Sequence, residues 1–157
     1  MLVHTVVDKY LGTDYIDNGR NPIKGLDCWG LIMCIIEDLF GIEFPNLNYK
    51  KFGLLRNYVK SGKSGQPVFI GSKEAIIKDY DMSSWVTPVK TQPLLGDLIL
   101  ICPIENLAIH AGVYLKSGKF IHAIVGQGVI VSEINNWVKQ IEGYYRIKPE
   151  LISKVGY

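Results

Sequence analysis

The sequence predicts an α+β domain in which helices come first and a meander of short strands follows. Residues 28–40 are apolar almost throughout, which is typical of a helix buried on most sides. Beyond residue 96 the chain changes to short β-type runs separated by Gly, Pro and Asn. Helices followed by strands indicate an α+β order, whereas alternation would indicate a parallel α/β sheet.

Length and charge narrow the class of protein. A chain of 157 residues is the size of one domain, assigned here to residues 1–157, and folding at this length buries roughly 70% of the unfolded surface. The formal net charge is only +2, with no basic stripe, so we expect no nucleic-acid partner. No apolar run approaches the roughly 20 residues of a membrane span, and the N-terminus does not resemble a Sec signal. We therefore expect synthesis in the cytoplasm, without a signal peptide and without membrane insertion.

The N-terminal segment predicts a short helix and then a loop. Residues 2–11 place Leu2, Val6 and Tyr10 on one helical face. Residues 12–25 are dense in Gly, Asn, Asp and Pro, which indicates a loop that delivers the chain to the next helix.

The apolar segment 28–40 has a start and a stop signal for a helix. Asp27 is a favourable N-cap residue, and Gly41 is placed to be the residue just beyond the C-terminus. From residue 31 onward only Glu37 and Asp38 are polar. We expect this segment to be the central helix of the domain.

The second half of the chain divides into an uncertain part and a clear part. Residues 45–92 form a poorly defined insertion, with helical segments expected within 44–62 and 72–82. The Ser117-Gly118 pair predicts a hairpin between the second and third β-type runs. Five runs are expected to form strands: 97–102, 109–115, 119–124, 128–134 and 144–147.

A cysteine at the start of the central helix is a candidate nucleophile. If Asp27 caps the helix, Cys28 is its first residue, beside unpaired backbone N–H groups. This end of a helix carries about half a positive charge, which favours thiolate over thiol. The same N–H groups, including the Cys28 backbone amide, can stabilise an oxyanion.

Two of the three histidines are candidates for the base that a thiol nucleophile needs. His4 lies in the N-terminal segment, whereas His110 and His122 lie in adjacent predicted strands. Their separation of twelve is even, so a hairpin centred near Ser117 would point both side chains to one face. A helix N-terminus packed against that face would bring Cys28 to the two histidines.

Other interpretations of the same residues stay open on pattern alone. Cys34 and Cys102 are expected to be core residues, and a histidine in a strand is often structural. Cys28, His110 and His122 are also possible zinc ligands, although their spacing fits no usual zinc framework. The three cysteines contain no C-x-x-C pair and do not predict a disulfide framework.

Four motifs in order resemble the NlpC/P60 family of cysteine peptidases. They are Asp-Cys-x-Gly-Leu opening a helix, Gly-Asp-Leu entering a strand, His-Ala-Gly-Val-Tyr-Leu, and Phe-Ile-His-Ala. The resemblance covers about residues 11–148. It implies a papain-like fold, with a buried N-terminal helix carrying the cysteine on an antiparallel sheet of about five strands. It also implies hydrolysis of peptidoglycan stem peptides, at D-glutamyl to diamino-acid bonds.

The resemblance assigns roles residue by residue. Cys28 matches the family's nucleophile, His110 its base, and His122 the third polar residue that orients the base. Tyr15 matches a tyrosine that lines the substrate-binding site, and Asp97 matches a residue that is structural. The resemblance implies that no metal or cofactor is required.

Departures from the common family pattern point to one branch. Trp29 stands where the family commonly has serine, and the Asn18-Gly19 pair replaces a usual Gly-Gly. Trp29, the segment NGRNP and the segment GYYRI are similar to the bacteriophage tail-associated branch. The expected partners are therefore the peptidoglycan stem peptide and other tail proteins, and the expected location is a virion tail or tail-like particle acting at the cell wall.

Two other functions remain as alternatives. In the first alternative, the chain keeps the fold without the activity and is a structural component that binds neighbouring proteins in a tail tip. Alternatively, it is an amidase or acyl transfer enzyme that uses Cys28, His110 and His122 on another amide.

Overall fold

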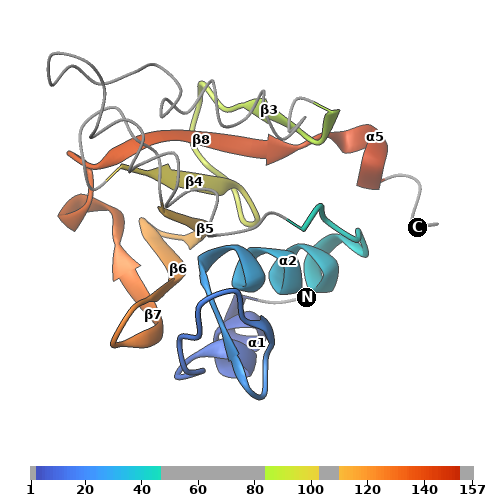
Figure 1. Cartoon of the computed structure of the whole chain (residues 1–157). Helices are drawn as coiled ribbons and strands as arrows, with labels where there is room; N and C mark the ends of the chain where they lie inside the picture. Colours follow the sequence, from blue (N-terminus) through green and yellow to red (C-terminus); the bar gives the residue numbers. More distant parts are fainter. Residues whose placement is uncertain (1–2, 47–83, 103–109, 153–157) are drawn as a thin grey trace, which may run out of the picture.

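The computed structural model describes residues 3–46, 84–102 and 110–152. A six-stranded antiparallel sheet in the order β3-β8-β4-β5-β6-β7 carries helix α2 along one face, and α1 packs beside α2 (Figure 1). The predicted α+β class is confirmed. The strands of this sheet are β3 (Val86–Pro88), β4 (Leu98–Ile101), β5 (His110–Lys116), β6 (Lys119–Ile124), β7 (Gly128–Glu133) and β8 (Ile141–Ile147).

Both N-terminal helices follow the signals in the sequence. Helix α1 (Val3–Tyr10) buries Val6 and Tyr10, the predicted apolar face, whereas Leu2 lies outside the described residues. Helix α2 (Cys28–Phe40) begins where Asp27 caps it and ends where Gly41 adopts a left-handed conformation with φ of 67°. Glycine is favoured there because it has no Cβ to clash.

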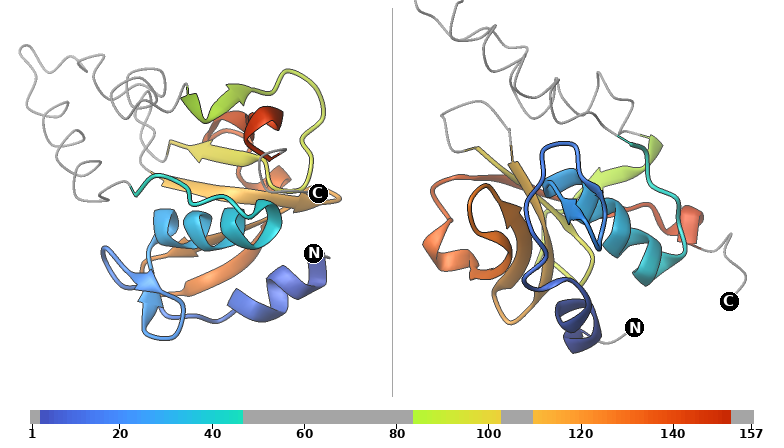
Figure 2. Two further views of the ribbon diagram at one scale, coloured as in Figure 1. Left: turned by 90° about the vertical axis from the view of Figure 1, so that its right-hand side faces the viewer. Right: turned by 60° about the horizontal axis from the view of Figure 1, so that its bottom comes forward.

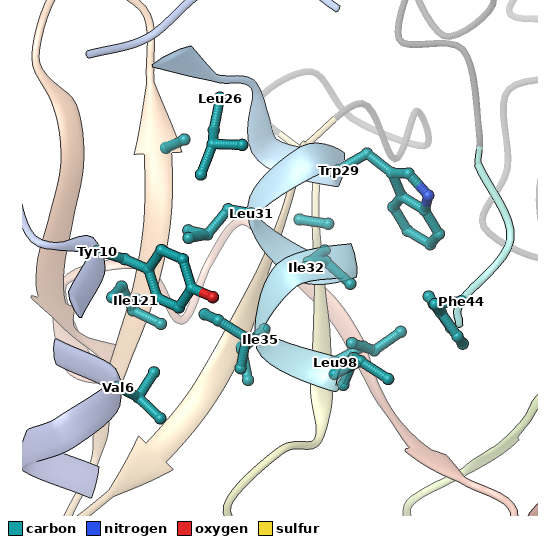
Figure 3. Close-up of a cluster of buried hydrophobic side chains, with 14 of the residues drawn as sticks. Val6, Tyr10, Leu26, Trp29, Leu31, Ile32, Ile35, Phe44, Leu98 and Ile121 are labelled. Atoms are coloured by element: carbon teal, nitrogen blue, oxygen red, sulfur yellow. The ribbon is translucent and has the colours of Figure 1, made fainter. Parts of the chain in front are cut away.

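The main hydrophobic core lies between α2 and the sheet. Leu31, Ile32 and Ile35 of α2 meet strand residues such as Leu98 and Ile121, with Tyr10 closing the side toward α1 (Figure 3). These side chains are 2% exposed or less. Burial of this apolar surface, at about 25 cal/mol per Å², is the main force that fixes α2 on the sheet.

The opposite face of the sheet carries a second, smaller apolar cluster. Ile99, Ile101 and Phe120 are its buried members, and Trp137 packs against it. Alternation along the strands explains the division, because Leu98 and Leu100 face α2 while Ile99 and Ile101 face away. The two faces of the sheet therefore have different neighbours.

Strands β4 to β7 form the predicted meander, and β8 returns to pair with the free side of β4. The turn between β5 and β6 is made by Ser117 and Gly118, both with positive φ (52° and 75°), as expected for a two-residue hairpin. Figure 2 shows from two further sides how α2 lies against these strands.

Three features differ from the sequence-based expectation or lie beyond it. The sheet has a sixth strand, β3, at its edge, and Pro88 ends it where a missing N–H is tolerated. The predicted loop 12–25 contains a small hairpin of β1 (Arg20–Asn21) and β2 (Gly25–Leu26). Most of the segment 45–92 lies outside the described residues. This includes the expected helical segment within 72–82 and all of the expected segment within 44–62 beyond residue 46.

The remaining short helices follow the meander. A 3₁₀ turn, η4 (Ile134–Asn136), links β7 to β8, and α5 (Pro149–Ile152) follows β8. Within residues 3–46, 84–102 and 110–152, no helix has the length and apolar character of a membrane span.

Candidate active site

The start of α2 is held tightly against the preceding loop. A Cβ on Gly30 would lie 2.1 Å from the carbonyl oxygen of Gly19, so only glycine permits this approach. Asn18 adopts a left-handed conformation (φ 59°), which asparagine tolerates better than most residues. Asn18 therefore occupies a turn position at which glycine is usual. The turn holds Gly19 against Gly30 and so helps to position Cys28 at the start of α2.

A buried carboxylate joins the loop to the helix. Asp27 is fully buried, and its Oδ1 accepts hydrogen bonds from the backbone N–H of Gly30 (2.7 Å) and from Arg20 (2.6 Å). Arg20 also donates to the carbonyl oxygen of Gly19 (2.8 Å). The ion pair balances a negative charge that would otherwise be costly to bury beside Cys28.

The ionisation state of Cys28 differs from the expectation based on the helix terminus. Burial, and then the charge of Asp27, raise the pKa of the thiol to about 12. Hydrogen bonds from the backbone amides of Ala111 and Trp29, and the charge of Arg20, oppose this rise without overcoming it. The helix end by itself favours thiolate over thiol, but desolvation of the charged form outweighs its partial charge.

The structure brings His110 and His122 together. The Nε2 atom of His110 lies 2.8 Å from Nδ1 of His122, and Nε2 of His122 lies 2.8 Å from the hydroxyl oxygen of Ser132. Gly112 faces His122 across the two strands, and a Cβ there would lie 3.1 Å from the Cβ of His122. The three polar side chains therefore form one continuous chain of hydrogen bonds from β5 through β6 to β7.

Apolar rings surround this polar chain. The ring of Phe120 lies 4.4 Å from that of His122, and Trp137 stands nearly perpendicular to His122 at 5.1 Å. Burial lowers the pKa of His110 to about 4, and burial followed by the neighbouring His110 lowers the pKa of His122 to about 3. Both imidazoles are thus neutral at pH 7.

The approach of Cys28 to the histidines also differs from the expectation. His122 shares its face of the sheet with Phe120, whereas α2 packs on the other face, against Ala111 and Ile121. The sequence had led us to expect that the helix terminus packs on the histidine face, and it does not. It reaches the beginning of β5 instead, where the thiol meets the backbone amide of Ala111, the residue after His110.

The other predicted residues have simpler surroundings. Tyr15 packs against the main core and bridges to Leu26, two residues before Cys28. Asp97 is buried and accepts two hydrogen bonds from Arg146 (2.9 and 2.8 Å), which fits a structural role.

The other two cysteines are buried or partly buried. Cys34 is partly buried against the core, and Cys102 is buried at the end of β4. In the part of the chain that the structure describes, no three His, Cys, Asp or Glu side chains are grouped as ligands for a metal ion.

Sequence reasoning did not identify three residues around the site. Ser132 gives a signal in retrospect, since it faces Phe120 across β6 and β7 and so shares the face of His122. The sequence shows Arg20 only as a basic residue in the loop before Asp27, which is a weak indication of an ion pair. Trp137 follows the predicted strand 128–134, and no periodic pattern in the sequence indicates that it lies near the histidines.

Comparison with known proteins identifies the family of this chain. The family model described as "NlpC/P60 family" matches residues 12–145. A gamma-DL-glutamyl hydrolase of Bacillus subtilis is 25% identical over 150 residues, which cover 94% of this chain and 29% of that protein. The murein DD-endopeptidase MepS/murein LD-carboxypeptidase of Escherichia coli K12 is 24% identical over 131 residues, covering 82% of this chain and 53% of the relative. The chain thus spans about half or less of these curated relatives.

Solved structures share the fold. The NlpC/P60 family protein from Bacillus cereus ATCC 10987 has a TM-score of 0.59 at 18% identity, covering 95% of this chain and 41% of that one. The NlpC/p60 domain of the peptidoglycan hydrolase SagA has a TM-score of 0.53 at 19% identity, covering 92% and 94%. The papain-like α+β fold is confirmed, and a family match over most of its length shows that this chain belongs to the NlpC/P60 family.

Proposed function

We propose that this chain is a cysteine peptidase that hydrolyses an amide bond in peptidoglycan stem peptides. The observation that carries the proposal is the hydrogen-bonded pair of His110 and His122, with Cys28 at the amide of the residue that follows His110. A thiol, a base and a group that orients the base are the parts that acyl transfer through a covalent intermediate requires.

The first step is attack of the Cys28 sulfur on the carbonyl carbon of the substrate. Because Nε2 of His110 is engaged by His122, Nδ1 is the nitrogen left to accept the thiol proton. The neutral imidazole has a lone pair for the proton of the neutral thiol, and the proton moves as the sulfur attacks. The protonated His110 then gives this proton to the leaving amine, and water, activated by the same imidazole, releases the acyl group from Cys28.

The helix terminus stabilises the oxyanion that attack creates. The backbone N–H of Gly30 is bonded to the Asp27 carboxylate, and that of Leu31 to the Asp27 carbonyl oxygen. The Trp29 amide lies at the Cys28 sulfur. The Cys28 amide is the remaining donor of this first turn and is the oxyanion donor in this proposal.

The family and two named relatives support the proposed substrate class. One relative is named a gamma-DL-glutamyl hydrolase and another a murein DD-endopeptidase/murein LD-carboxypeptidase. The bond that we propose this chain hydrolyses joins D-glutamate to the diamino acid. Tyr15, beside Leu26 and close in sequence to Cys28, is assigned to substrate binding.

Digestion of purified murein followed by mass analysis tests the reaction. We expect new free amino groups within stem peptides for the wild type and for Cys34→Ala, and none for Cys28→Ala. Cleavage at the sugar–peptide link would identify an amidase instead. No release by the folded wild type would favour a structural component of a tail tip.

We also propose that the protein is carried by a phage tail or tail-like particle and acts locally on the cell wall. The support is the similarity of Trp29, of the segment NGRNP before Cys28 and of the segment GYYRI near the end of the chain to the tail-associated branch. Trp29 is buried, donates to the carbonyl oxygen of Pro45 (2.7 Å) and stacks on Phe44 at 5.5 Å. Mass spectrometry of purified particles from the source cells should detect the chain. Its absence from intact particles would contradict this location.

A further inference from the structure

The chain of hydrogen bonds does not end at His122. The Ser132 hydroxyl oxygen lies 2.8 Å from Nε2 of His122, on the side away from His110. We propose that Ser132 is a positioning residue that accepts the N–H of His122 and thereby fixes the tautomers of both histidines. The inference rests on the proposed function, in which His110 is the base for Cys28.

Counting protons shows why the direction of this bond matters. A neutral imidazole carries one N–H, so the two ring nitrogens of each histidine have opposite roles. If Ser132 accepts from Nε2–H of His122, then Nδ1 of His122 is an acceptor. His110 must then donate from Nε2, and its Nδ1 keeps a lone pair for the thiol proton.

The reverse direction disables the base. If Ser132 donated to Nε2 of His122, Nδ1 of His122 would carry the proton and donate to Nε2 of His110. The remaining N–H of His110 would then be on Nδ1, the atom that has to accept the proton of Cys28. The direction of the hydrogen bond at Ser132, two strands away from β5, therefore distinguishes an active from an inactive arrangement of the same atoms.

The surroundings make Ser132 decisive for His122. The His122 side chain has no exposed surface, so bulk water does not offer a substitute partner. Phe120 and Trp137 cover the ring with apolar surface. Among the described residues, His110 and Ser132 are the hydrogen-bond partners of this ring. Burial keeps both imidazoles neutral, and only neutral rings have a tautomer to select.

Nitrogen-15 NMR of the histidine rings at pH 7 tests the tautomers without reference to activity. The chain has only three histidines, and His4 on α1 is exposed, so a His4→Gln spectrum contains the signals of His110 and His122 alone, and a His122→Asn spectrum then tells these two apart. We expect protonated Nε2 and unprotonated Nδ1 in both His110 and His122. A wild-type spectrum with His122 protonated at Nδ1 would overturn the inference, whatever the activity.

Variants then connect the tautomers to turnover. Ser132→Ala should populate the other tautomer of His122 and lower kcat about 10-fold or more, with little change in KM. Ser132→Thr keeps the hydroxyl and should restore both the spectrum and kcat. Thr87→Ala removes a hydroxyl from β3 at the opposite edge of the sheet and should change neither.

The outcomes separate this inference from the proposed function. Wild-type tautomers and kcat in folded Ser132→Ala would refute the role of Ser132 while Cys28-dependent cleavage still stands. Absence of Cys28-dependent cleavage would refute the proposed function, and the spectra would still decide the tautomers. If Ser132→Ala does not fold, the wild-type and Ser132→Thr spectra decide the inference.

Discussion

Arg20 and Asp27 form an ion pair of 2.6 Å across the junction between the loop and the first turn of α2. Asp27 is fully buried, whereas about a quarter of the Arg20 side chain is exposed (24%). The pair therefore has two effects, because it neutralises a buried charge that caps the helix and offsets the influence of that charge on the neighbouring Cys28 thiol. A second pair, Arg146 with Asp97, has a similarly buried carboxylate but joins β8 to the residue just before β4.

These two pairs allow a matched comparison. Arg20→Met and Arg146→Met should each lower the free energy of unfolding by about 3 kcal/mol, since each leaves a buried carboxylate without its cation. Only Arg20→Met should slow alkylation of Cys28 by iodoacetamide, because loss of the cation raises the thiol pKa further. Denaturant unfolding and peptide mapping after timed labelling measure both effects. Equal labelling rates in the two variants would show that Arg20 does not influence the thiol.

Substitutions of the two histidines should separate the proposed base, His110, from its proposed orienting partner, His122. His110→Ala should reduce turnover to near background, because no other side chain is proposed to accept the Cys28 proton. His122→Asn should keep measurable activity, since its amide oxygen can accept the hydrogen bond from Nε2 of His110. His122→Ala should lose more, by up to roughly 10⁴-fold if serine-protease triads are a guide.

Activity of these variants has to be compared in folded protein, with matching melting temperatures. Greater activity in His110→Ala than in His122→Ala would reverse the two roles. Full activity in both would remove the histidines from the mechanism.

The acid limb of the pH–rate profile should lie well below the usual range for histidine. Burial lowers the pKa of His110 to about 4, so the base stays unprotonated as pH falls through 6.5. We expect kcat/KM, which reports the free enzyme, to hold to about pH 5 and then to fall. Tryptophan fluorescence at each pH monitors folding. Half-maximal kcat/KM near pH 6.5 in folded protein would contradict the buried, neutral base.

The same lowered pKa values predict acid sensitivity of the fold. In the unfolded chain, His110 and His122 take up protons as pH falls below about 6.5, whereas in the folded chain they remain neutral until about pH 4 and 3. Protons therefore favour the unfolded state in this window, and stability should decline from pH 6.5 downward, by on the order of 3 kcal/mol for His110 alone.

His122→Asn should flatten that decline because it removes one of the two groups. His4→Gln, which changes an exposed side chain on α1, is the control and should follow the wild-type curve. Denaturant melts at several pH values measure the slopes. Parallel slopes for His122→Asn and the wild type would show that His122 does not contribute.

Gly30→Ala should separate loop position from helix propensity. Alanine favours a helix by about 1 kcal/mol over glycine, so propensity alone predicts a more stable protein. The added Cβ would lie 2.1 Å from the Gly19 carbonyl oxygen, however, and the loop has to move away. We expect lower stability and a large loss of kcat, whereas Glu37→Ala on the exposed side of α2 should change neither much. A more stable and fully active Gly30→Ala would show that the loop does not position Cys28.

Much of the fold was determined by local patterns in the sequence. Asp27 and Gly41 marked the two ends of α2, and the Ser117-Gly118 pair fixed the β5–β6 hairpin, because capping and turn formation depend on residues close in sequence. The even spacing of His110 and His122 likewise predicted their shared face. The edge strand β3 was missed, since its short run contains Pro88 and pairs with a strand far along the chain.

The chemistry of the site was decided by tertiary structure. A helix N-terminus by itself predicts a thiolate at Cys28, but burial in the fold raises its pKa to about 12. The same burial lowers the pKa of both histidines, and the register of β7 supplies Ser132 as the last partner in their chain. The sequence pointed to Cys28, His110 and His122 as candidates, because their motifs are short and local. Packing of distant segments decided their charge state, because desolvation depends on everything that surrounds a group.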